Sequence, residues 1–445
     1  MSTKTEKVLV FVFGATTGAT LYEFVVGRGF RFLWKKQIPW ITDGQVYIWP
    51  MDWLKGILDE VKAMATPGTI ITSAMWGADV VHMDGDEIVG KVLHYRSVPP
   101  EFAGRLIKDS GVSNYEWSRL MGNVHLAFYQ AVFSSCFWRE YTRCGSYLHV
   151  IPLADWITWQ LSGQKGHDRV MLHNQGLGVP TSRLVNHYFD NIHHSLFAPV
   201  WPEFCSSQLV ETEYVVPCTH DSALARAVLA STGLSWGLWT GSWYGVCKIL
   251  NGKMSDINED TFNAGLVAEA MPGNEMSAIS NIGMHGPLYK ALKNVNGEIS
   301  YESATKLALA RLDSVVDDGH VFYPEALSLK PDDFASFALE KEGGDLSLAL
   351  AVMVNTIAVN CKSGLSTAAS ALGLSTPSNV AMVGGFSENK AILEALRLNG
   401  VNVVVPPFAE LATQAGAAAH ALCLAGMARN IKESLEMFPN VELTE

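Results

Sequence analysis

The chain is poor in charge, and in positive charge most of all. Lys and Arg together number 32 against 44 Asp and Glu, which gives a formal net charge of -12. Because nucleic acids and anionic membrane surfaces attract basic patches, this balance argues against both as partners. The seven cysteines are scattered and include no C-x-x-C pair. We therefore expect free thiols in a reducing cytoplasm, and neither a disulfide framework nor a zinc site.

Targeting and standard nucleotide motifs are also missing. The apolar run at residues 8–13 is too short for a signal peptide and predicts a strand. No apolar stretch approaches the roughly 20 residues that span a bilayer, so we expect no membrane insertion. Neither the P-loop pattern G-x-x-x-x-G-K-[ST] nor the fingerprint G-x-G-x-x-G occurs. Any phosphate site must therefore use another kind of turn.

The composition of the chain is typical of a well-packed globular protein. Hydrophobic residues make up 48% of the chain and charged residues 17%, and 445 residues fit two domains of about 200 residues each. Strand patterns at 7–13 and 20–26 flank a small-residue turn, which predicts a hairpin. The longest helical pattern covers 345–372, and a buried strand follows at 379–383.

Both halves of the chain begin with strands and continue with alternating helices and strands. This order predicts two similar α/β layers, each a mixed sheet packed with helices. No low-complexity linker separates them, so we place a tight hinge directly after Asp221. The predicted domains are residues 1–221 and 222–445.

Three turns rich in Gly, Ser and Thr follow predicted strands. They lie at residues 14–18, at Thr240-Gly241-Ser242 and at residues 384–387. Glycine lets backbone N–H groups approach phosphate oxygens, and hydroxyls add donors. Each turn taken alone is more often an ordinary turn than a ligand loop.

Asp221 stands at the junction between a strand pattern and a helix pattern, in the segment PCTHDSA at 217–223. An Asp in this position is most often a helix N-cap, and chemistry alone favours that interpretation. The alternative is a carboxylate at the mouth of an interdomain cleft that accepts a proton from a substrate hydroxyl.

The motifs resemble, in order, those of the FGGY carbohydrate kinases, and most of all the rhamnulokinase and fuculokinase branch. The resemblance rests on THDSALA (219–225), WTGSWYGV (239–246) and VGGFSENKAI (383–392). In the first half, MWGADVV at 75–81 and DWITWQLSG at 155–163 fall in the expected places. Each motif is short, but together they cover nearly the whole chain.

The resemblance implies a fold of two RNase H-like domains, as in actin and hexokinase, with an interdomain cleft. It implies ATP and Mg²⁺ as cofactors and a small ketose or deoxy-ketose as substrate, with Asp221 as the general base. The sequence names neither the sugar nor the metal ligands nor the assembly, for which a homodimer is the candidate. The implied sugar-side residues are Trp76, Gly77, Gln130 and His220, and the implied nucleotide-side residues are Gly14, Thr16, Thr17, Gly241, Ser242, Gly384, Gly385, Ser387 and Asn389.

Three positions depart from the family pattern. Val12 stands where the family has an Asp that helps to hold Mg²⁺, and valine offers no oxygen to a hard cation. Ala19 replaces an expected basic residue, and Ala74 replaces an Asp.

Three hypotheses remain. The first is a kinase whose Mg²⁺ is held by ATP, water and a remaining acid (Asp221 or Asp79), and the second is a sugar- and nucleotide-binding regulatory protein without phosphoryl transfer. The third is an actin-like ATPase without a sugar acceptor.

Overall fold

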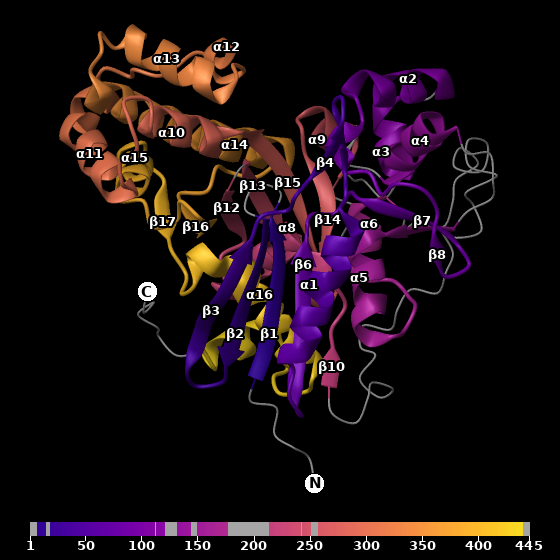
Figure 1. Ribbon diagram of the computed structural model, residues 1–445. Coiled ribbons are helices and arrows are strands. Elements are labelled where there is room, and N and C mark those ends of the chain that lie inside the picture. The colour runs from indigo at the N-terminus through magenta and orange to yellow at the C-terminus, as the bar shows by residue number, and fades with distance from the viewer. Residues whose placement is uncertain are drawn as a thin grey trace. The chain divides into compact units, whose positions relative to one another are not determined.

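The computed structural model describes residues 7–14, 18–111, 113–120, 131–143, 149–176, 213–241, 243–250 and 257–438 (Figure 1). The chain divides into two compact units. The first consists of residues 1–227, 267–276 and 413–445, and the second of residues 228–266 and 277–412. The domain limits 1–221 and 222–445 stay a prediction.

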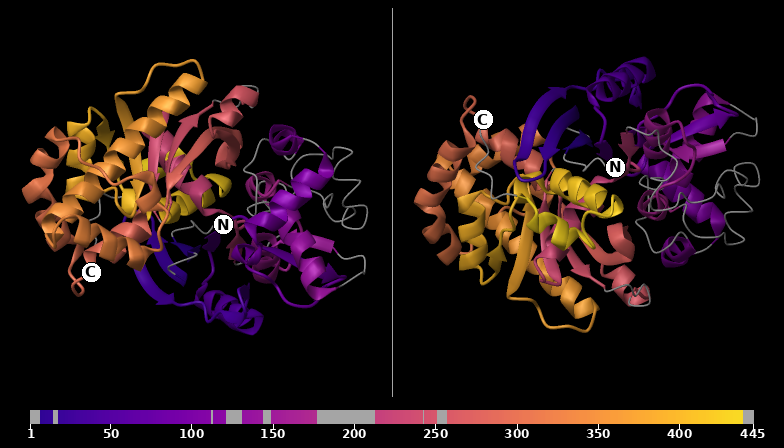
Figure 2. Two further views of the ribbon diagram at one scale, coloured as in Figure 1. Left: turned by 90° about the horizontal axis from the view of Figure 1, so that it is seen from above. Right: turned by 90° about the horizontal axis from the view of Figure 1, so that it is seen from below.

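The first unit is built on a sheet with the strand order β10-β6-β1-β2-β3. Strands β1, β2 and β3 form an antiparallel meander, and β6 and β10 are added in parallel. The indigo ribbons of the meander stay side by side in the turned views of Figure 2. The short strand β11 also pairs with β6. The bounds are β1 (Lys7–Gly14), β2 (Gly18–Val25), β3 (Gly29–Lys36), β6 (Thr69–Met75), β10 (Glu213–Val215) and β11 (Thr219–His220).

The second unit repeats this topology. Its strands are neighbours in the order β15-β13-β12-β16-β17. Again three strands form an antiparallel meander, and two more are added in parallel beside its first strand. The predicted pair of similar α/β layers is therefore confirmed. The bounds are β12 (Trp236–Thr240), β13 (Tyr244–Ile249), β15 (Glu275–Gly283), β16 (Asn379–Gly384) and β17 (Asn402–Val404).

Helices pack against both sheets. In the first unit, α5 lies against β6 and β10, and in the second unit α14 lies against β13. Further strands of the first unit are β4 (Ile41–Asp43), β5 (Val46–Ile48), β7 (Val80–Asp84), β8 (Glu87–Ile88), β9 (His149–Pro152) and β14 (Val267–Met271). The described helices are α1 (Met51–Met64), α2 (Pro100–Ser110), α3 (Asn114–Leu120), α4 (Ala131–Thr142), α5 (Leu153–Ser162), α6 (Arg169–Asn174), α8 (Asp221–Ser231), α9 (Glu259–Asn263), α10 (His285–Lys293), α11 (Tyr301–Asp317), α12 (Pro324–Leu327), α13 (Pro331–Lys341), α14 (Leu346–Ala371), α15 (Lys390–Leu398), α16 (Ala412–Leu424) and α17 (Ile431–Glu436).

The central helix of the second unit, α14, differs from one sequence expectation. Its length and composition are those of a membrane span, with a mean hydropathy of 1.4 over its most apolar window. We had expected no stretch of that kind. Within the fold, 67% of this window is buried, because α10, α11, α13 and α15 all pack against the helix. Such burial is typical of a core helix.

Candidate active site

Asp221 is the first residue of α8, directly after the short strand β11. Because β11 pairs with β6 in parallel, its carboxyl end opens at the same edge of the sheet as that of β6. The Asp221 side chain is 31% exposed. Its Oδ1 accepts a hydrogen bond of 2.7 Å from the N–H of the adjacent residue, Ser222. The helix N-terminus favours a negative charge here, and the carboxylate stays accessible.

Two other predicted site residues lie against Asp221. Nε2 of His220 is 3.9 Å from Oδ1 of Asp221. Gly77 follows β6, and a Cβ added there would lie only 2.6 Å from Cδ2 of His220. A glycine is therefore needed at position 77 because the imidazole ring occupies the space of a side chain. The structure brings together Gly77, His220 and Asp221, and their roles at a ligand stay a prediction.

Trp76 is mostly part of the core. Only 7% of it is exposed, and its ring stacks on Trp49 with centroids 5.5 Å apart. Trp40 packs against both of these rings, and His94 packs against Trp40 and Trp76. The role of Trp76 at a sugar stays a prediction, and its packing in this aromatic cluster is what the structure adds.

Asp79 holds this aromatic cluster through buried hydrogen bonds. Its Oδ2 accepts a 2.5 Å hydrogen bond from Nε1 of Trp49, and its Oδ1 accepts one of 2.8 Å from the N–H of Tyr95. Burial raises the pKa of Asp79 to about 7, although these N–H donors oppose the rise. Both oxygens are thus engaged in the interior, which makes Asp79 a poor ligand for Mg²⁺.

The two positions at which the resemblance implies carboxylates are neighbours in the sheet. Val12 on β1 is paired with Ala74 on β6, and Ala74 is paired with Thr219 on β11. Adjacent strands are about 4.8 Å apart, so this row runs straight to the segment that carries Asp221. Val12 is 7% exposed and Ala74 is fully buried. The row offers no carboxylate oxygen, and within the described residues no group of three His, Cys, Asp or Glu could hold a metal ion.

In the second unit, two predicted turns lie at the ends of paired strands. Gly384 on β16 has φ +106°, and a Cβ there would lie 1.7 Å from the carbonyl oxygen of Thr240 on β12. Oγ1 of Thr240 donates to the carbonyl oxygen of Val383 at 3.0 Å and accepts from the N–H of Phe386. Only glycine fits at position 384, and the contact closes the two turns against each other.

The glycines beside this contact face open space. Among the described residues, a Cβ added at Gly385 would meet no atom within 4 Å, and one at Gly241 would meet only the carbonyl oxygen of Trp243, at 3.8 Å. A phosphate or a nucleoside can therefore approach the backbone at both positions, which fits the predicted nucleotide role. That role stays a prediction.

Other predicted residues of the nucleotide side have structural tasks. Asn389 is the N-cap of α15, and its Oδ1 accepts hydrogen bonds from the N–H groups of Ala391 and Ile392. Ser387 is fully buried, and its N–H donates to the carbonyl oxygen of Gly384. Gly14 ends β1 opposite Gly18. Four predicted residues lie outside the described ranges: Thr16, Thr17, Gln130 and Ser242.

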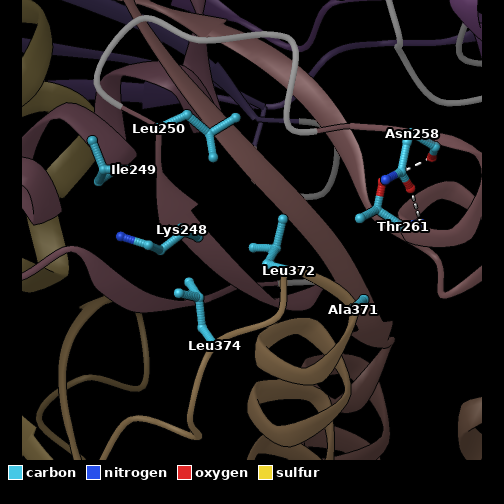
Figure 3. A pocket seen from close by; sticks show the side chains of 8 residues that line it. All are labelled: Lys248, Ile249, Leu250, Asn258, Thr261, Ala371, Leu372 and Leu374. Carbon is cyan, nitrogen blue, oxygen red and sulfur yellow. Dashed lines mark hydrogen bonds between the residues drawn. The ribbon is translucent and has the colours of Figure 1, made fainter.

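A pocket of about 370 Å³ lies elsewhere in the second unit (Figure 3). It contains none of the predicted site residues, because it opens at the end of β13 remote from Gly241. Its wall consists of Lys248, Ile249, Leu250, Asn258, Thr261, Ala371, Leu372 and Leu374.

Sequence reasoning missed three polar residues around His220. Arg226 on α8 is fully buried and donates to Glu269 on β14 at 2.7 Å and to Ser222 at 3.1 Å. Asn174 on α6 lies 3.4 Å from the ring of His220. Glu269 is 43 residues from Arg226 and Asn174 is 46 from His220, so no local pattern connects them.

Comparison with solved structures relates the fold to carbohydrate kinases. A xylulose kinase from Lactobacillus acidophilus superposes with a TM-score of 0.72 at 13% identity, covering 98% of this chain and 93% of that one. Glycerol kinase from Plasmodium falciparum gives 0.71 at 11% identity, with coverage of 98% and 93%. Gluconate kinase from L. acidophilus gives 0.71 at 12%, with coverage of 98% and 92%.

These identities show a shared fold. The predicted class, two RNase H-like domains of the ATPase type, is confirmed by these likenesses and by the repeated sheet topology. No protein-family model matches the sequence, and no curated protein is significantly similar to it. The resemblance to the rhamnulokinase and fuculokinase branch stays a prediction.

Proposed function

We propose that this protein is an ATP-dependent carbohydrate kinase acting on a small ketose or deoxy-ketose. The observation that carries the proposal is the accessible carboxylate of Asp221, which lies beside Gly77 and His220 in a chain with the fold of carbohydrate kinases. A buried N-cap would offer no proton acceptor to a ligand. Asp221 instead keeps nearly a third of its side chain exposed.

In the proposed reaction, Asp221 acts as general base on the sugar hydroxyl. The hydroxyl proton passes to a carboxylate oxygen of Asp221 while the hydroxyl oxygen bonds to the γ-phosphorus of ATP and the bond to ADP breaks. Gly77 leaves room for His220 to stand beside the carboxylate, and both residues would orient the sugar. Mg²⁺, when bound, would neutralise phosphate charge, and Asp221 is the described carboxylate placed to take part in holding it.

The nucleotide phosphates would be bound by backbone N–H groups rather than by side chains. Gly241 and Gly385 both leave open space above a turn that follows a strand, and the contact of Gly384 with Thr240 fixes the two turns. Backbone N–H groups in such turns bind phosphate oxygens without any Lys or Arg. This arrangement suits a protein of net charge -12.

The decisive experiment measures ADP release with Mg-ATP over a panel of ketoses and deoxy-ketoses. Sugar-dependent turnover is expected in the wild type and a loss of about 10²- to 10⁴-fold in Asp221→Asn, which keeps the size of the side chain. Thermal unfolding of the variant should match that of the wild type. Turnover that survives in Asp221→Asn at the wild-type rate would exclude Asp221 as the base.

The second candidate is a regulatory protein that binds sugar and nucleotide without transfer. The observation in its favour is the apolar row of Val12 and Ala74 beside the strand that leads to Asp221. Calorimetry distinguishes the two, because this candidate predicts sugar binding with no ADP release. If the missing carboxylate limits an active kinase, Val12→Asp should raise turnover and Val12→Asn, of similar size but uncharged, should not.

A further inference from the structure

A chain of polar contacts runs through the first unit and ends on the imidazole of His220. Glu269 accepts from Nη2 of Arg226 at 2.7 Å, and Nη1 of Arg226 lies 3.1 Å from Oγ of Ser222. Oγ of Ser222 lies 3.0 Å from Nδ1 of His220. The Arg226 side chain has no exposed surface and that of Glu269 is 11% exposed. The Glu269–Arg226 ion pair is thus anchored in the interior.

The direction of each hydrogen bond follows from the donors. A guanidinium has only N–H groups, so Arg226 donates to Oγ of Ser222. One lone pair of the Ser222 hydroxyl is thereby occupied, but its second lone pair and its hydrogen remain, so it can meet Nδ1 of His220 either as acceptor or as donor. The ion pair holds Oγ of Ser222 beside the ring, and the direction of the bond depends on a further contact of Nδ1.

Asn174 provides this further contact from a second side. Its Oδ1 accepts from the N–H of Ala270 at 2.9 Å, and its Nδ2 donates to the carbonyl oxygen of the same residue at 3.2 Å. This pair of backbone bonds decides which side-chain atom is the nitrogen. The nitrogen, Nδ2, lies 3.4 Å from Nδ1 of His220. The Asn174 amide thus donates to Nδ1, which must accept, so the Ser222 hydroxyl donates to the same nitrogen and the ring proton is on Nε2.

We propose that Glu269, Arg226, Ser222 and Asn174 are positioning residues that hold His220 in the Nε2–H tautomer. In this state His220 presents an N–H donor beside the Asp221 carboxylate, at the 3.9 Å separation of Nε2 and Oδ1. Nε2 then has no lone pair to accept a proton, so proton abstraction falls to Asp221 alone.

The pair of groups selects a class of ligand. Asp221 accepts from a hydroxyl, and His220 donates to an oxygen. Because the carboxylate of Asp221 and the N–H of His220 are adjacent, they can bind two oxygens on adjacent carbons of one ligand. The geometry therefore selects a hydroxyl next to an acceptor oxygen, as in a vicinal diol or an α-hydroxy ketone. This last step rests on the proposed function, whereas the tautomer of His220 does not.

The test is ¹⁵N NMR of the full chain with ¹⁵N-labelled histidine at pH 8, with His220 assigned by the signal lost in His220→Gln. The wild type should show a single tautomer, with Nε2 protonated and Nδ1 not. Ser222→Ala removes the nearer donor and should shift the resonances toward an average of both tautomers. Ser222→Thr keeps the hydroxyl and should restore the wild-type pattern.

Two results would overturn the proposal. One is a wild-type His220 that carries its proton on Nδ1 or averages between tautomers. The other is a Ser222→Ala spectrum identical to that of the wild type. Neither readout needs a sugar, ATP or turnover, so a negative kinase assay does not affect this test. If the tautomer test fails, the role of Asp221 as general base is still decided by the ADP assay.

Discussion

The two groups of candidate residues are built in opposite ways. Around Asp221, side chains are fixed by other side chains, through the buried ion pair of Arg226 and Glu269. Around Gly384, backbone is fixed by backbone, through its contact with Thr240. The first region should respond to changes in which atoms carry protons and charge. The second should respond to changes in volume, whatever the chemistry of the added atoms.

The largest effect should come from Gly384→Ala. The new Cβ would overlap the carbonyl oxygen of Thr240, and φ is +106° at this position. Because β12 and β16 must move apart to admit it, we expect a loss of about 3 kcal/mol or more in the free energy of unfolding. Urea unfolding followed by circular dichroism measures this loss.

Gly385→Ala is the matched control. Its Cβ would meet no atom within 4 Å, so the stability should change by no more than about 0.5 kcal/mol. If a nucleotide lies against this glycine, its affinity should fall while the stability stays. Equal stability losses in the two variants would contradict the role assigned to the Thr240 contact.

The next effect concerns pH and the buried acid of the first region. Burial raises the pKa of Asp79 to about 7, whereas an unfolded Asp titrates near 4. Between these values the folded state binds a proton that the unfolded state lacks, so stability should fall as pH rises. Between pH 5 and pH 7 the loss should be on the order of 2 kcal/mol.

Calorimetric unfolding across this pH range tests the direction. Asp79→Asn removes the titrating group and should flatten the profile. A part of the slope should remain, since burial also raises the pKa of Asp168 to about 7, with the same sign. A wild-type stability that rises from pH 5 to pH 7 would show that the hydrogen bonds to Asp79 outweigh its burial.

Gly77→Ala should reduce activity more than stability. The added methyl would lie 2.6 Å from Cδ2 of His220 and 3.1 Å from Sδ of Met171, and both are side-chain atoms that can shift. Moving the imidazole from its place beside Asp221 should lower kcat/KM by about tenfold, or about 1.4 kcal/mol. Gly56→Ala on α1, where the methyl meets nothing within 4 Å, is the control and should leave kcat/KM unchanged.

The smallest expected effect is at Asn389, where two variants distinguish helix capping from ligand binding. Asn389→Ala should destabilise the protein by about 1 kcal/mol, because the N-cap of α15 is lost. Asn389→Asp retains a cap and should unfold like the wild type. A loss of ATP affinity in the Asp variant at unchanged stability would add a ligand contact to the capping role.

The sequence predicted those elements whose pattern is local and strong. The hairpin of β1 and β2, the long helix α14 and the strand β16 that follows it all agree with the structure. No element was predicted at 29–36, the range of β3. This strand is only partly buried, and its polar residues obscure the alternation of apolar and polar positions that indicates a strand.

The candidate site was predictable only where motifs carry it. The THD motif and the Trp-Gly pair single out Gly77, His220 and Asp221, which the structure brings together, while their roles at a ligand stay a prediction. The ion pair of Arg226 and Glu269 joins two elements far apart in sequence, and neither residue belongs to a recognisable motif. Buried polar contacts of this kind depend on the folded sheet order, which a single sequence does not reveal.

The register of Val12 and Ala74 also has a genetic consequence. Valine and alanine codons that end in a pyrimidine each become an aspartate codon through one change at the second base. Strand pairing uses main-chain atoms, so neither change alters the hydrogen-bond partners of β1 or β6. A lineage carrying this fold can therefore lose or regain an acidic residue in the row of paired strand positions that leads toward Asp221 in a single mutational step, with the sheet already in place to receive it.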